Sequence, residues 1–249
     1  MTGKVILGDA LAVMRQMAEQ KELVDAVIMD PPYCSGGVTE SGKGRAGSQG
    51  LRSSTTGAQR FKWFDGDNMT LAGLSWLLRQ VAIEAFNVMP PTGSLLVFCD
   101  WRMAFSLGPA IESAGFRLRN VVVWDKGHMG LGTGFRPRHE MILHLTCSSP
   151  TFHAADVANV VTAKRVHASQ KKHPTEKPVD LMRSLIRVVT PEKGTVLDPF
   201  CGSGSTGEAA LSVGRNFVGI ERCESYCAVA RRRLAAVHVA SHTTEPVTT

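Results

Sequence analysis

The sequence predicts an α/β fold in which a largely parallel sheet is covered by helices on both faces. Short apolar runs such as 26–29 and 94–100 alternate along the chain with longer segments whose apolar residues recur at helical spacing. Strands that alternate with helices pair in parallel, because each helix carries the chain back to the same end of the sheet. Ligands of such sheets bind beyond the carboxyl ends of the strands, so residues that follow a strand are candidate site residues.

Seven strands and six helices are expected along the chain. The run at 26–29 is continuously apolar, which indicates a buried strand. Pro178 begins a helix, since proline is favoured at a first helical position. The glycine-rich segment 127–134 joins a strand pair. The expected strands are 4–7, 26–29, 94–100, 116–126, 139–145, 194–198 and 216–221, and the expected helices are 10–17, 71–88, 104–114, 178–189, a segment that begins near 205, and 225–237.

Length and composition predict a single domain, 1–237, followed by a disordered tail, 238–249. Its 249 residues and 43% hydrophobic content can fill the core of one α/β domain. Glycine, serine, threonine and arginine dominate 34–62, which predicts a mobile loop. No apolar run approaches the ~20 residues of a membrane span, and the N-terminus lacks the long apolar stretch of a signal peptide. We therefore expect a cytoplasmic protein.

The cysteines and the charge balance narrow the chemistry only slightly. No two cysteines form a C-x-x-C pair, so buried free thiols are expected rather than a metal site. Lysine and arginine outnumber aspartate and glutamate by 28 to 22, which permits a polyanionic partner without proving one. The cysteines are Cys34, Cys99, Cys147, Cys201, Cys223 and Cys227.

A glycine-rich turn lies directly between an expected strand and an expected helix. The stretch "DPFCGSGSTGEAA" matches G-x-G-x-x-G through Gly202, Gly204 and Gly207, and Glu221 closes the next strand. Small residues permit close approach of the backbone to a ligand, and the helix N-terminus offers hydrogen-bond donors. A nicotinamide or flavin dinucleotide fits this turn, and so does a nucleoside such as S-adenosylmethionine. A tight turn with no ligand is the remaining alternative.

The stretch "VIMDPPY" ends a buried strand on a rigid acidic corner. Proline fixes φ and holds the preceding residue extended, so Asp30 cannot enter a helical turn. Asp30 and the Pro31 carbonyl can accept the two hydrogens of an amino group while Tyr33 stacks on a planar ring, as extruded bases are held. This geometry suits an aminated nucleobase, although a rigid strand exit would give the same residues.

Four motifs in this order resemble the beta class of amino-directed DNA methyltransferases. After Gly8-Asp9 they are "DPPY", "HPTEKPVDLMRSLI", "DPFCGSGSTGEAA" and "GIERCESYCAVARRRL". The resemblance covers most of 4–234. It implies a Rossmann-like methyltransferase fold with a seven-stranded, mostly parallel sheet, S-adenosylmethionine as the cofactor, double-stranded DNA as a partner, a homodimer, and a place in restriction–modification.

The resemblance also assigns roles to individual residues. Asp9 would contact the adenine of the cofactor, Glu221 its ribose hydroxyls, and 200–204 its methionine portion. Ser205, Thr206 and Lys177 would lie near the cofactor carboxylate. Alternatively, Lys177 is an ordinary solvated lysine. Asp198 either binds the cofactor or only caps the turn. The catalytic residues are Asp30, Pro31, Pro32 and Tyr33; the cofactor-binding residues are Asp9, Lys177, Asp198, Phe200, Cys201, Gly202, Gly204, Ser205, Thr206 and Glu221.

Two basic segments are candidates for DNA contact. Target recognition in this family lies between the strand pair and the lysine-proline motif, here 147–173, and the loop 34–62 adjoins the catalytic tetrapeptide. Positive side chains beside an active site favour phosphate contact over a merely solvated face. By contrast, Arg136, Arg138 and His139 are expected to be structural. The candidate DNA-binding residues are Arg45, Arg52, Arg60, Lys164, Arg165, Lys171 and Lys172.

The function expected from the sequence is site-specific methylation of N6 of a flipped adenine in duplex DNA. Asp at the first position of the tetrapeptide favours adenine, where the family often has Ser for cytosine. The alternatives are N4-cytosine methylation and a non-catalytic DNA-binding relative of the fold. An oxidoreductase that binds a dinucleotide would leave the tetrapeptide without a role.

Overall fold

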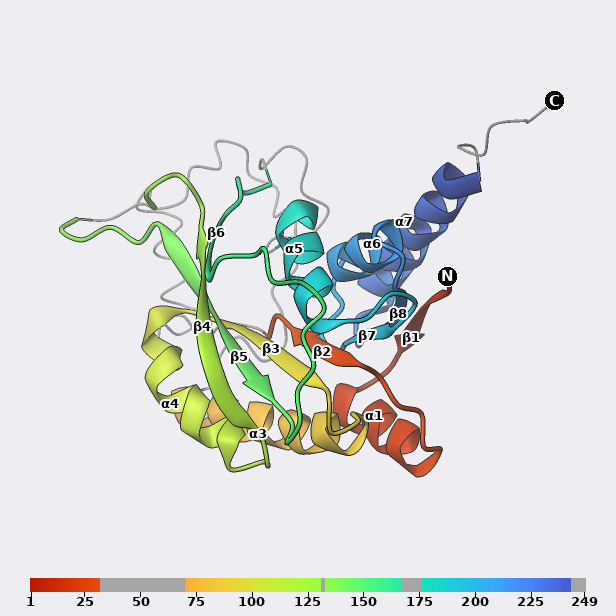
Figure 1. Cartoon of the computed structure of the whole chain (residues 1–249), viewed down its shortest axis with the longest axis horizontal. Helices are drawn as coiled ribbons and strands as arrows, with labels where there is room; N and C mark the ends of the chain where they lie inside the picture. Colours follow the sequence, from red (N-terminus) through yellow and green to blue (C-terminus); the bar gives the residue numbers. More distant parts are fainter. Residues whose placement is uncertain (32–69, 131–132, 167–175, 243–249) are drawn as a thin grey trace.

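The computed structural model describes residues 1–31, 70–130, 133–166 and 176–242 (Figure 1). Within these ranges one sheet passes through the molecule, and helices pack on both of its faces (Figure 1). The predicted fold class is therefore confirmed.

The sheet has eight strands in the order β1-β8-β7-β2-β3-β5-β4-β6. Only β5 runs against its neighbours among the described strands; every other pair is parallel. The expected seven strands are present, and β6 is an eighth, paired with the end of β4. The strands are β1 Gly3–Leu7, β2 Ala26–Met29, β3 Ser94–Cys99, β4 Arg117–Asp125, β5 His139–Thr146, β6 Val160–Thr162, β7 Thr195–Asp198 and β8 Asn216–Glu221.

The prediction of seven strands was wrong because β6 carries too little signal. It contains three residues, and two of these are exposed, so neither a buried apolar run nor an alternating pattern is visible in it. Pairing with 123–125 of β4 forms this strand, which makes it a product of tertiary contact.

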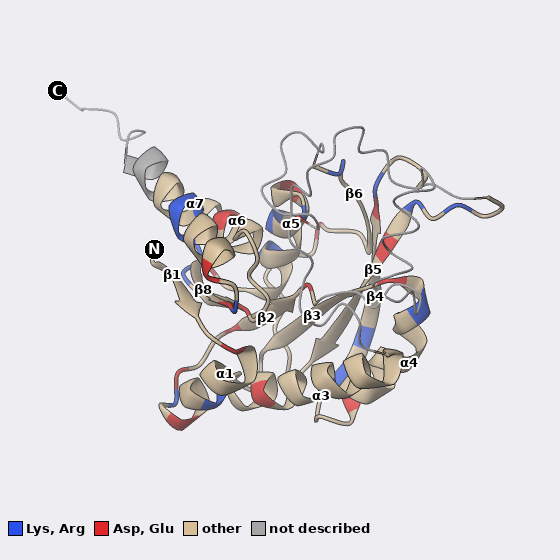
Figure 2. Ribbon diagram, turned by 180° about the vertical axis from the view of Figure 1, so that it is seen from behind, with Lys and Arg blue, Asp and Glu red and all other residues tan. Residues whose placement is uncertain are grey.

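Among the described helices, three pack on one face of the sheet and three on the other. Figures 1 and 2 show helices on both faces. The first face carries α1 Ala10–Glu19, α3 Leu71–Asn87 and α4 Trp101–Glu112; the second carries α5 Val179–Val189, α6 Ser205–Ser212 and α7 Glu224–His242. Helix α7 continues past 237, where the domain was expected to end. In the described part of the chain, no helix combines the length and apolar character that crossing a membrane requires.

Helix α4 begins earlier than the sequence suggested, because of its cap. The Asp100 carboxylate accepts hydrogen bonds from the backbone N–H groups of Arg102 and Met103, at 2.9 and 3.1 Å. An aspartate at this position satisfies donors that otherwise lack a partner at a helix start. Asp100, the last residue of the expected strand 94–100, is therefore the N-cap of α4.

Alternate residues of the central strands form two separate cores. In β2, Val27 and Met29 pack on the face of α1, α3 and α4, whereas Ala26 and Ile28 pack on the face of α5, α6 and α7. All four side chains are at most 1% exposed. Burial on both faces explains why this strand is continuously apolar in the sequence.

The direction of the chain through the sheet reverses between β2 and β7. From β2 the chain continues to β3 on one side, whereas from β7 it continues to β8 on the other side. In open α/β sheets a ligand binds at such a switch point, beyond the carboxyl ends of the two strands. The fold thus places a candidate site where Asp30 follows β2 and the glycine turn follows β7.

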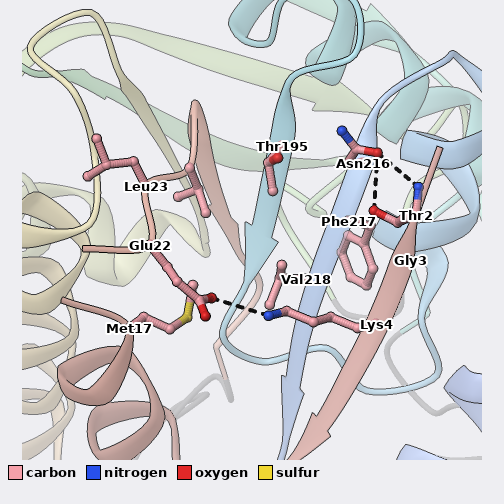
Figure 3. A pocket seen from close by; sticks show the side chains of 11 residues that line it. Thr2, Gly3, Lys4, Met17, Glu22, Leu23, Thr195, Asn216, Phe217 and Val218 are labelled. Carbon is pink, nitrogen blue, oxygen red and sulfur yellow. Dashed lines mark hydrogen bonds and ion pairs between the residues drawn. The ribbon is translucent and has the colours of Figure 1, made fainter. Parts of the chain in front are cut away.

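A shallow pocket lies at the opposite edge of the sheet, at the amino ends of β1, β7 and β8 (Figure 3). Lys4 and Glu22 face each other across it, with their charged atoms 3.2 Å apart (Figure 3). Both side chains are about half exposed, and this pocket is remote from the strand ends that carry the sequence motifs.

Four of the cysteines are buried free thiols, as predicted: Cys99, Cys147, Cys201 and Cys227. Cys223 is exposed, so the prediction was wrong for this residue. It lies in the short turn between β8 and α7, where its side chain is not part of either core. Cys34 lies outside the described residues.

Replacing Gly207 by alanine is expected to destabilise the fold by about 1–3 kcal/mol, the usual effect of overpacking a core. A Cβ there would lie 2.6 Å from the Phe217 ring and 2.9 Å from Leu234. Urea unfolding measures the change. Gly108→Ala in α4 is the matched control, because its Cβ would meet only Leu118, at 3.5 Å. Equal stability of the two variants would contradict this account of the packing.

Candidate active site

The turn after β7 is braced by the carboxylate of Asp198. One oxygen accepts a hydrogen bond from the Phe200 backbone N–H at 3.0 Å, and the other accepts one from the Thr206 hydroxyl at 2.6 Å. Burial raises the pKa of Asp198 to about 7, even though both hydrogen bonds favour the charged form. Of the two roles considered for this residue, capping of the turn is the one that these contacts support.

Glycine is required where the turn enters helix α6. Gly204 is the N-cap residue of α6, and its φ of 81° lies in the left-handed region that other residues avoid. A Cβ here would also approach Ala230 to 3.0 Å. The helix start that follows, with Ser205 and Thr206 buried, presents the positive end of the helix dipole at the carboxyl edge of the sheet.

Glu221 ties the end of β8 to the same turn. Its carboxylate accepts hydrogen bonds from the backbone N–H groups of Gly202 and Cys223, both at 2.8 Å. Burial raises the pKa of Glu221 above its ordinary value, against the effect of these hydrogen bonds. Each carboxylate oxygen has a second lone pair, so Glu221 can still accept hydrogen bonds from a ligand.

The exposed Asp9 lies next to Glu221 through the pairing of β1 with β8. The backbone N–H of Gly8 donates to the Glu221 carbonyl at 3.0 Å. Asp9 is the N-cap of α1, and its carboxylate accepts a hydrogen bond from the Ala12 N–H at 3.1 Å. Two acidic residues predicted to hold one cofactor therefore lie at the carboxyl ends of neighbouring strands: Glu221 ends β8, and Asp9 follows β1.

Asp30 is held by a buried ion pair with Lys177. The Lys177 ammonium lies 2.6 Å from Asp30 Oδ1 and 3.4 Å from Glu140 Oε2, and the lysine is 4% exposed. The interpretation of Lys177 as a solvated lysine was therefore wrong. Burial lowers the pKa of Lys177, but attraction to the two carboxylates and their hydrogen bonds outweighs burial and leaves this pKa above its ordinary value.

Asp30 and the glycine turn lie side by side. Strands β2 and β7 are neighbours, paired at 26 with 196 and at 27 with 197, so Asp30 and Asp198 leave the same edge of the sheet. The negative charge of Asp30 contributes to the raised pKa of Asp198, which places the two carboxylates within electrostatic range. Pro31 is buried beside them. The other predicted catalytic residues, Pro32 and Tyr33, lie outside the described residues.

Glu140 and Lys126 were missed by the sequence analysis, although they complete this ion-pair network. The Lys126 ammonium lies 2.6 Å from Glu140 Oε1, and Glu140 contacts Lys177 through its other oxygen. The only sequence signal was an acid at the start of an otherwise apolar strand, "HEMILHL". Such a residue is costly to bury unless it is paired.

The remaining cofactor positions also lie in the turn. Phe200 is partly buried and packs against the core on the side of α1, α3 and α4, and Cys201 is 4% exposed. Burial raises the pKa of the Cys201 thiol well above its ordinary value, so this cysteine is an unreactive packing residue. Cys201 packs closely against β8, where a Cβ on Gly219 would meet its sulfur at 2.6 Å.

Two of the predicted DNA-binding residues are described, and both are exposed. Lys164 and Arg165 follow β6, which is parallel to β4, so they lie at the edge that carries Asp30. Figure 2 shows basic residues near β6 and on the loop between β4 and β5. The others lie outside the described residues: Arg45, Arg52, Arg60, Lys171 and Lys172.

The arginines between β4 and β5 stabilise that loop. The Arg138 guanidinium makes two bonds to the Asp125 carboxylate, at 2.6 and 2.7 Å, and holds the pKa of Asp125 at about 2. Arg136 donates to the Gly130 carbonyl at 2.8 Å. These contacts agree with the structural role expected for both residues.

Comparison with known proteins identifies the family. Residues 24–232 match the model of a DNA methylase family, N6_N4_Mtase, and the chain belongs to this family. A protein named as a methylase, YubD of Escherichia coli (strain K12), is 30% identical over 234 residues, covering 94% of this chain and 91% of the relative. The type II methyltransferase M2.DpnII of Streptococcus pneumoniae is 28% identical over 243 residues, covering 86% and 84%. The resemblance seen in the motifs is thereby confirmed.

Solved structures share the fold. The crystal structure of the M1.HpyAVI–SAM complex superposes with a TM-score of 0.67 at 24% identity, covering 94% of this chain and 100% of the other. The PvuII DNA methyltransferase, described as cytosine-N4-specific, gives a TM-score of 0.70 at 16% identity, covering 98% and 94%. These similarities confirm a Rossmann-like methyltransferase fold.

Replacing Thr206 by valine is expected to destabilise the fold by about 1–3 kcal/mol, since Asp198 loses its hydroxyl donor in a buried site. The raised pKa of Asp198 means that its bound proton stabilises the fold at low pH and that this stability is lost as pH rises through about 7. The hydrogen bond from Thr206 lowers the pKa of Asp198, so this pKa is higher in the variant. The stability of the variant therefore continues to fall to a higher pH than that of the wild type. Urea unfolding should therefore give a larger difference at pH 8.5 than at pH 6.

Thr162→Val, exposed in β6, is the control and should stay within about 0.5 kcal/mol of the wild type. A difference for Thr206→Val that does not change with pH would contradict the role given to Asp198.

Proposed function

We propose that this chain is a site-specific DNA methyltransferase that uses S-adenosylmethionine to methylate N6 of an adenine flipped out of duplex DNA. The observation that carries the proposal is the position of Asp30. It follows β2, directly beside the glycine turn that follows β7, and Lys177 holds its carboxylate at 2.6 Å. Membership of the DNA methylase family supports the choice of reaction and of DNA as the substrate.

The residues around the turn fit S-adenosylmethionine. Glu221 would accept hydrogen bonds from the ribose hydroxyls, and the neighbouring Asp9 would contact the adenine. The backbone at 200–204 would surround the methionine portion, whose carboxylate suits the positive N-terminus of α6. Gly202 and Gly204 both have positive φ, at 52° and 81°, and without side chains they leave the backbone open to a ligand. When bound, this cofactor supplies a methyl group attached to a positively charged sulfur.

We assign Lys177 to Asp30 instead of to the cofactor carboxylate. Its ammonium already contacts two carboxylates, Asp30 and Glu140, and a third acid at the same nitrogen would leave excess negative charge in a buried site. The helix start at Ser205 and Thr206 is then the better place for the cofactor carboxylate.

The described catalytic residues act on the amino group of the target base. Asp30 and the Pro31 carbonyl accept its two hydrogens and draw the nitrogen toward tetrahedral geometry, which frees the lone pair. The negative charge of Asp30 stabilises the positive charge that develops on this nitrogen. Because both acceptors belong to one rigid corner, the main contribution of the protein is positioning. Tyr33, next along the chain, is proposed to stack on the base.

Adenine is preferred to cytosine because of the acid at position 30. In the family that the motifs resemble, Asp at this position is associated with adenine more often than with cytosine. The fold permits either base, since PvuII DNA methyltransferase, which has the same fold, is described as cytosine-N4-specific. A homodimer is also part of the proposal, because each chain has little surface for reading a DNA sequence.

DNA from a methylation-free host that expresses this chain is expected to carry N6-methyladenine at one short sequence, as read by single-molecule sequencing. Asp30→Asn should abolish the mark, because the amide cannot provide the negative charge. Glu22→Gln, at the opposite edge of the sheet, should leave the mark in place. N4-methylcytosine would overturn the choice of adenine. Unmodified DNA from a folded protein that binds the cofactor would support a non-catalytic relative.

The double substitution Lys164→Ala with Arg165→Ala is expected to weaken binding to every duplex, specific or not. Two lost phosphate contacts should reduce the slope of log K against log salt by about 2. Fluorescence anisotropy across a salt series gives this slope. The charge-matched control, Lys4→Ala with Lys21→Ala at the other edge, should leave it unchanged. An equal effect of both pairs would indicate only a general dependence on net charge.

A further inference from the structure

Glu140 lies in the middle of a buried chain of alternating charges. The order is Lys126, Glu140, Lys177 and Asp30, with contacts of 2.6, 3.4 and 2.6 Å between successive charged atoms. The side chains are between 5% and 18% exposed, so water screens these charges only weakly. Two ammonium groups and two carboxylates give the chain no net charge.

The four residues come from distant parts of the fold. Asp30 follows β2, Glu140 is the second residue of β5, Lys126 follows β4, and Lys177 precedes α5. Strand β3 separates β2 from β5, and the Lys177 ammonium lies 5.0 Å from the centroid of the Phe98 ring of β3. Lys177 therefore passes over the end of β3 and connects two strands that are not paired.

The Lys177 ammonium is shared between Asp30 and Glu140, and this sharing determines how strongly it neutralises the charge of Asp30. Asp30 is the nearer partner, at 2.6 Å, and Glu140 is the farther one, at 3.4 Å. If Glu140 were neutral, the ammonium charge would act more strongly on Asp30. A carboxylate neutralised in this way accepts a weaker hydrogen bond and stabilises less positive charge on a neighbouring nitrogen.

We propose that Glu140 is a positioning residue for methyl transfer: by sharing the ammonium of Lys177, it keeps Asp30 oriented and a strong acceptor for the amino group of the target base. This inference rests on the role proposed above for Asp30. Glu140 does not touch the base. It acts through Lys177, and Lys126 in turn competes for Glu140.

The competition gives opposite expectations for substitution of Glu140 and of Lys126. Glu140→Gln removes one carboxylate from Lys177, so the ammonium neutralises Asp30 more strongly; this should lower kcat about tenfold or more, as loss of a supporting partner typically does. Lys126→Gln removes one competitor for Glu140, so Glu140 attracts the Lys177 ammonium more strongly and Asp30 is neutralised less. This variant should keep kcat or raise it, although it breaks an ion pair of the same length as the Asp30 pair.

The experiment measures kcat and KM for methyl transfer from a labelled donor to duplex DNA, in the wild type and four variants. Glu140→Gln should lower kcat and leave both KM values within about threefold, and Glu140→Asp should recover part of the loss. Glu84→Gln is the matched control: Glu84 is a mostly buried carboxylate, 2.8 Å from Arg15 and far from the carboxyl edge. Its kcat should equal that of the wild type.

Two results would overturn the inference. One is a kcat of Glu140→Gln within twofold of the wild type. The other is an equal loss of kcat in Lys126→Gln and Glu140→Gln, which would mean that the ion pairs only support the fold. If Glu140→Gln does not fold, Lys126→Gln and Glu140→Asp decide between these outcomes. Absence of methyl transfer by the folded wild type would instead overturn the proposed function itself, so the two failures are distinguishable.

Discussion

The buried ammonium of Lys177 is the interaction on which the arrangement of the site depends. A buried charge without a partner costs several kcal/mol, so this lysine is compatible with the fold only while carboxylates approach it. Asp30 and Glu140 approach from strands that are not neighbours, and the Phe98 ring lies near the ammonium between them. The electrostatic requirement of one side chain thus fixes the ends of β2 and β5 relative to each other.

The turn after β7 uses carboxylates in a similar way. Asp198 accepts a hydrogen bond from the backbone N–H of Phe200 and Glu221 accepts one from that of Gly202, and burial raises the pKa of both acids. The turn is therefore held in shape by the protein itself. A site shaped before its ligand arrives loses less conformational entropy on binding.

The sequence was informative where burial dictates composition. Central strands such as β2 are apolar on both faces, so their positions could be read directly, and the motifs placed Asp30 and Glu221 at strand ends. The edge strand β6 could not be predicted, because only its pairing with β4 defines it. The start of α4 was missed because Asp100 resembles the end of a strand until its capping bonds are seen.

Side-chain partners distant in sequence were the main omission. Lys177 was expected either near the cofactor or in solvent, whereas it pairs with Asp30, which lies far upstream in the sequence. The local pattern around Glu140 shows an acid in an apolar strand but does not indicate which residue pairs with it, because the pairing with Lys126 depends on where β4 and β5 place the two side chains. Such contacts follow from topology, and topology is not visible in a short motif.

The order of the strands has a consequence for synthesis on the ribosome. Strand β7 lies between β2 and β8, and β8 lies between β7 and β1, so the first strands made are joined only by the last two. Until these emerge, one edge of β2 has no neighbour and its backbone groups are unpaired. A polypeptide released early would therefore lack both the strands that join β1 to β2 and the turn beside Asp30. The candidate active site can therefore be assembled only after the last two strands have been made.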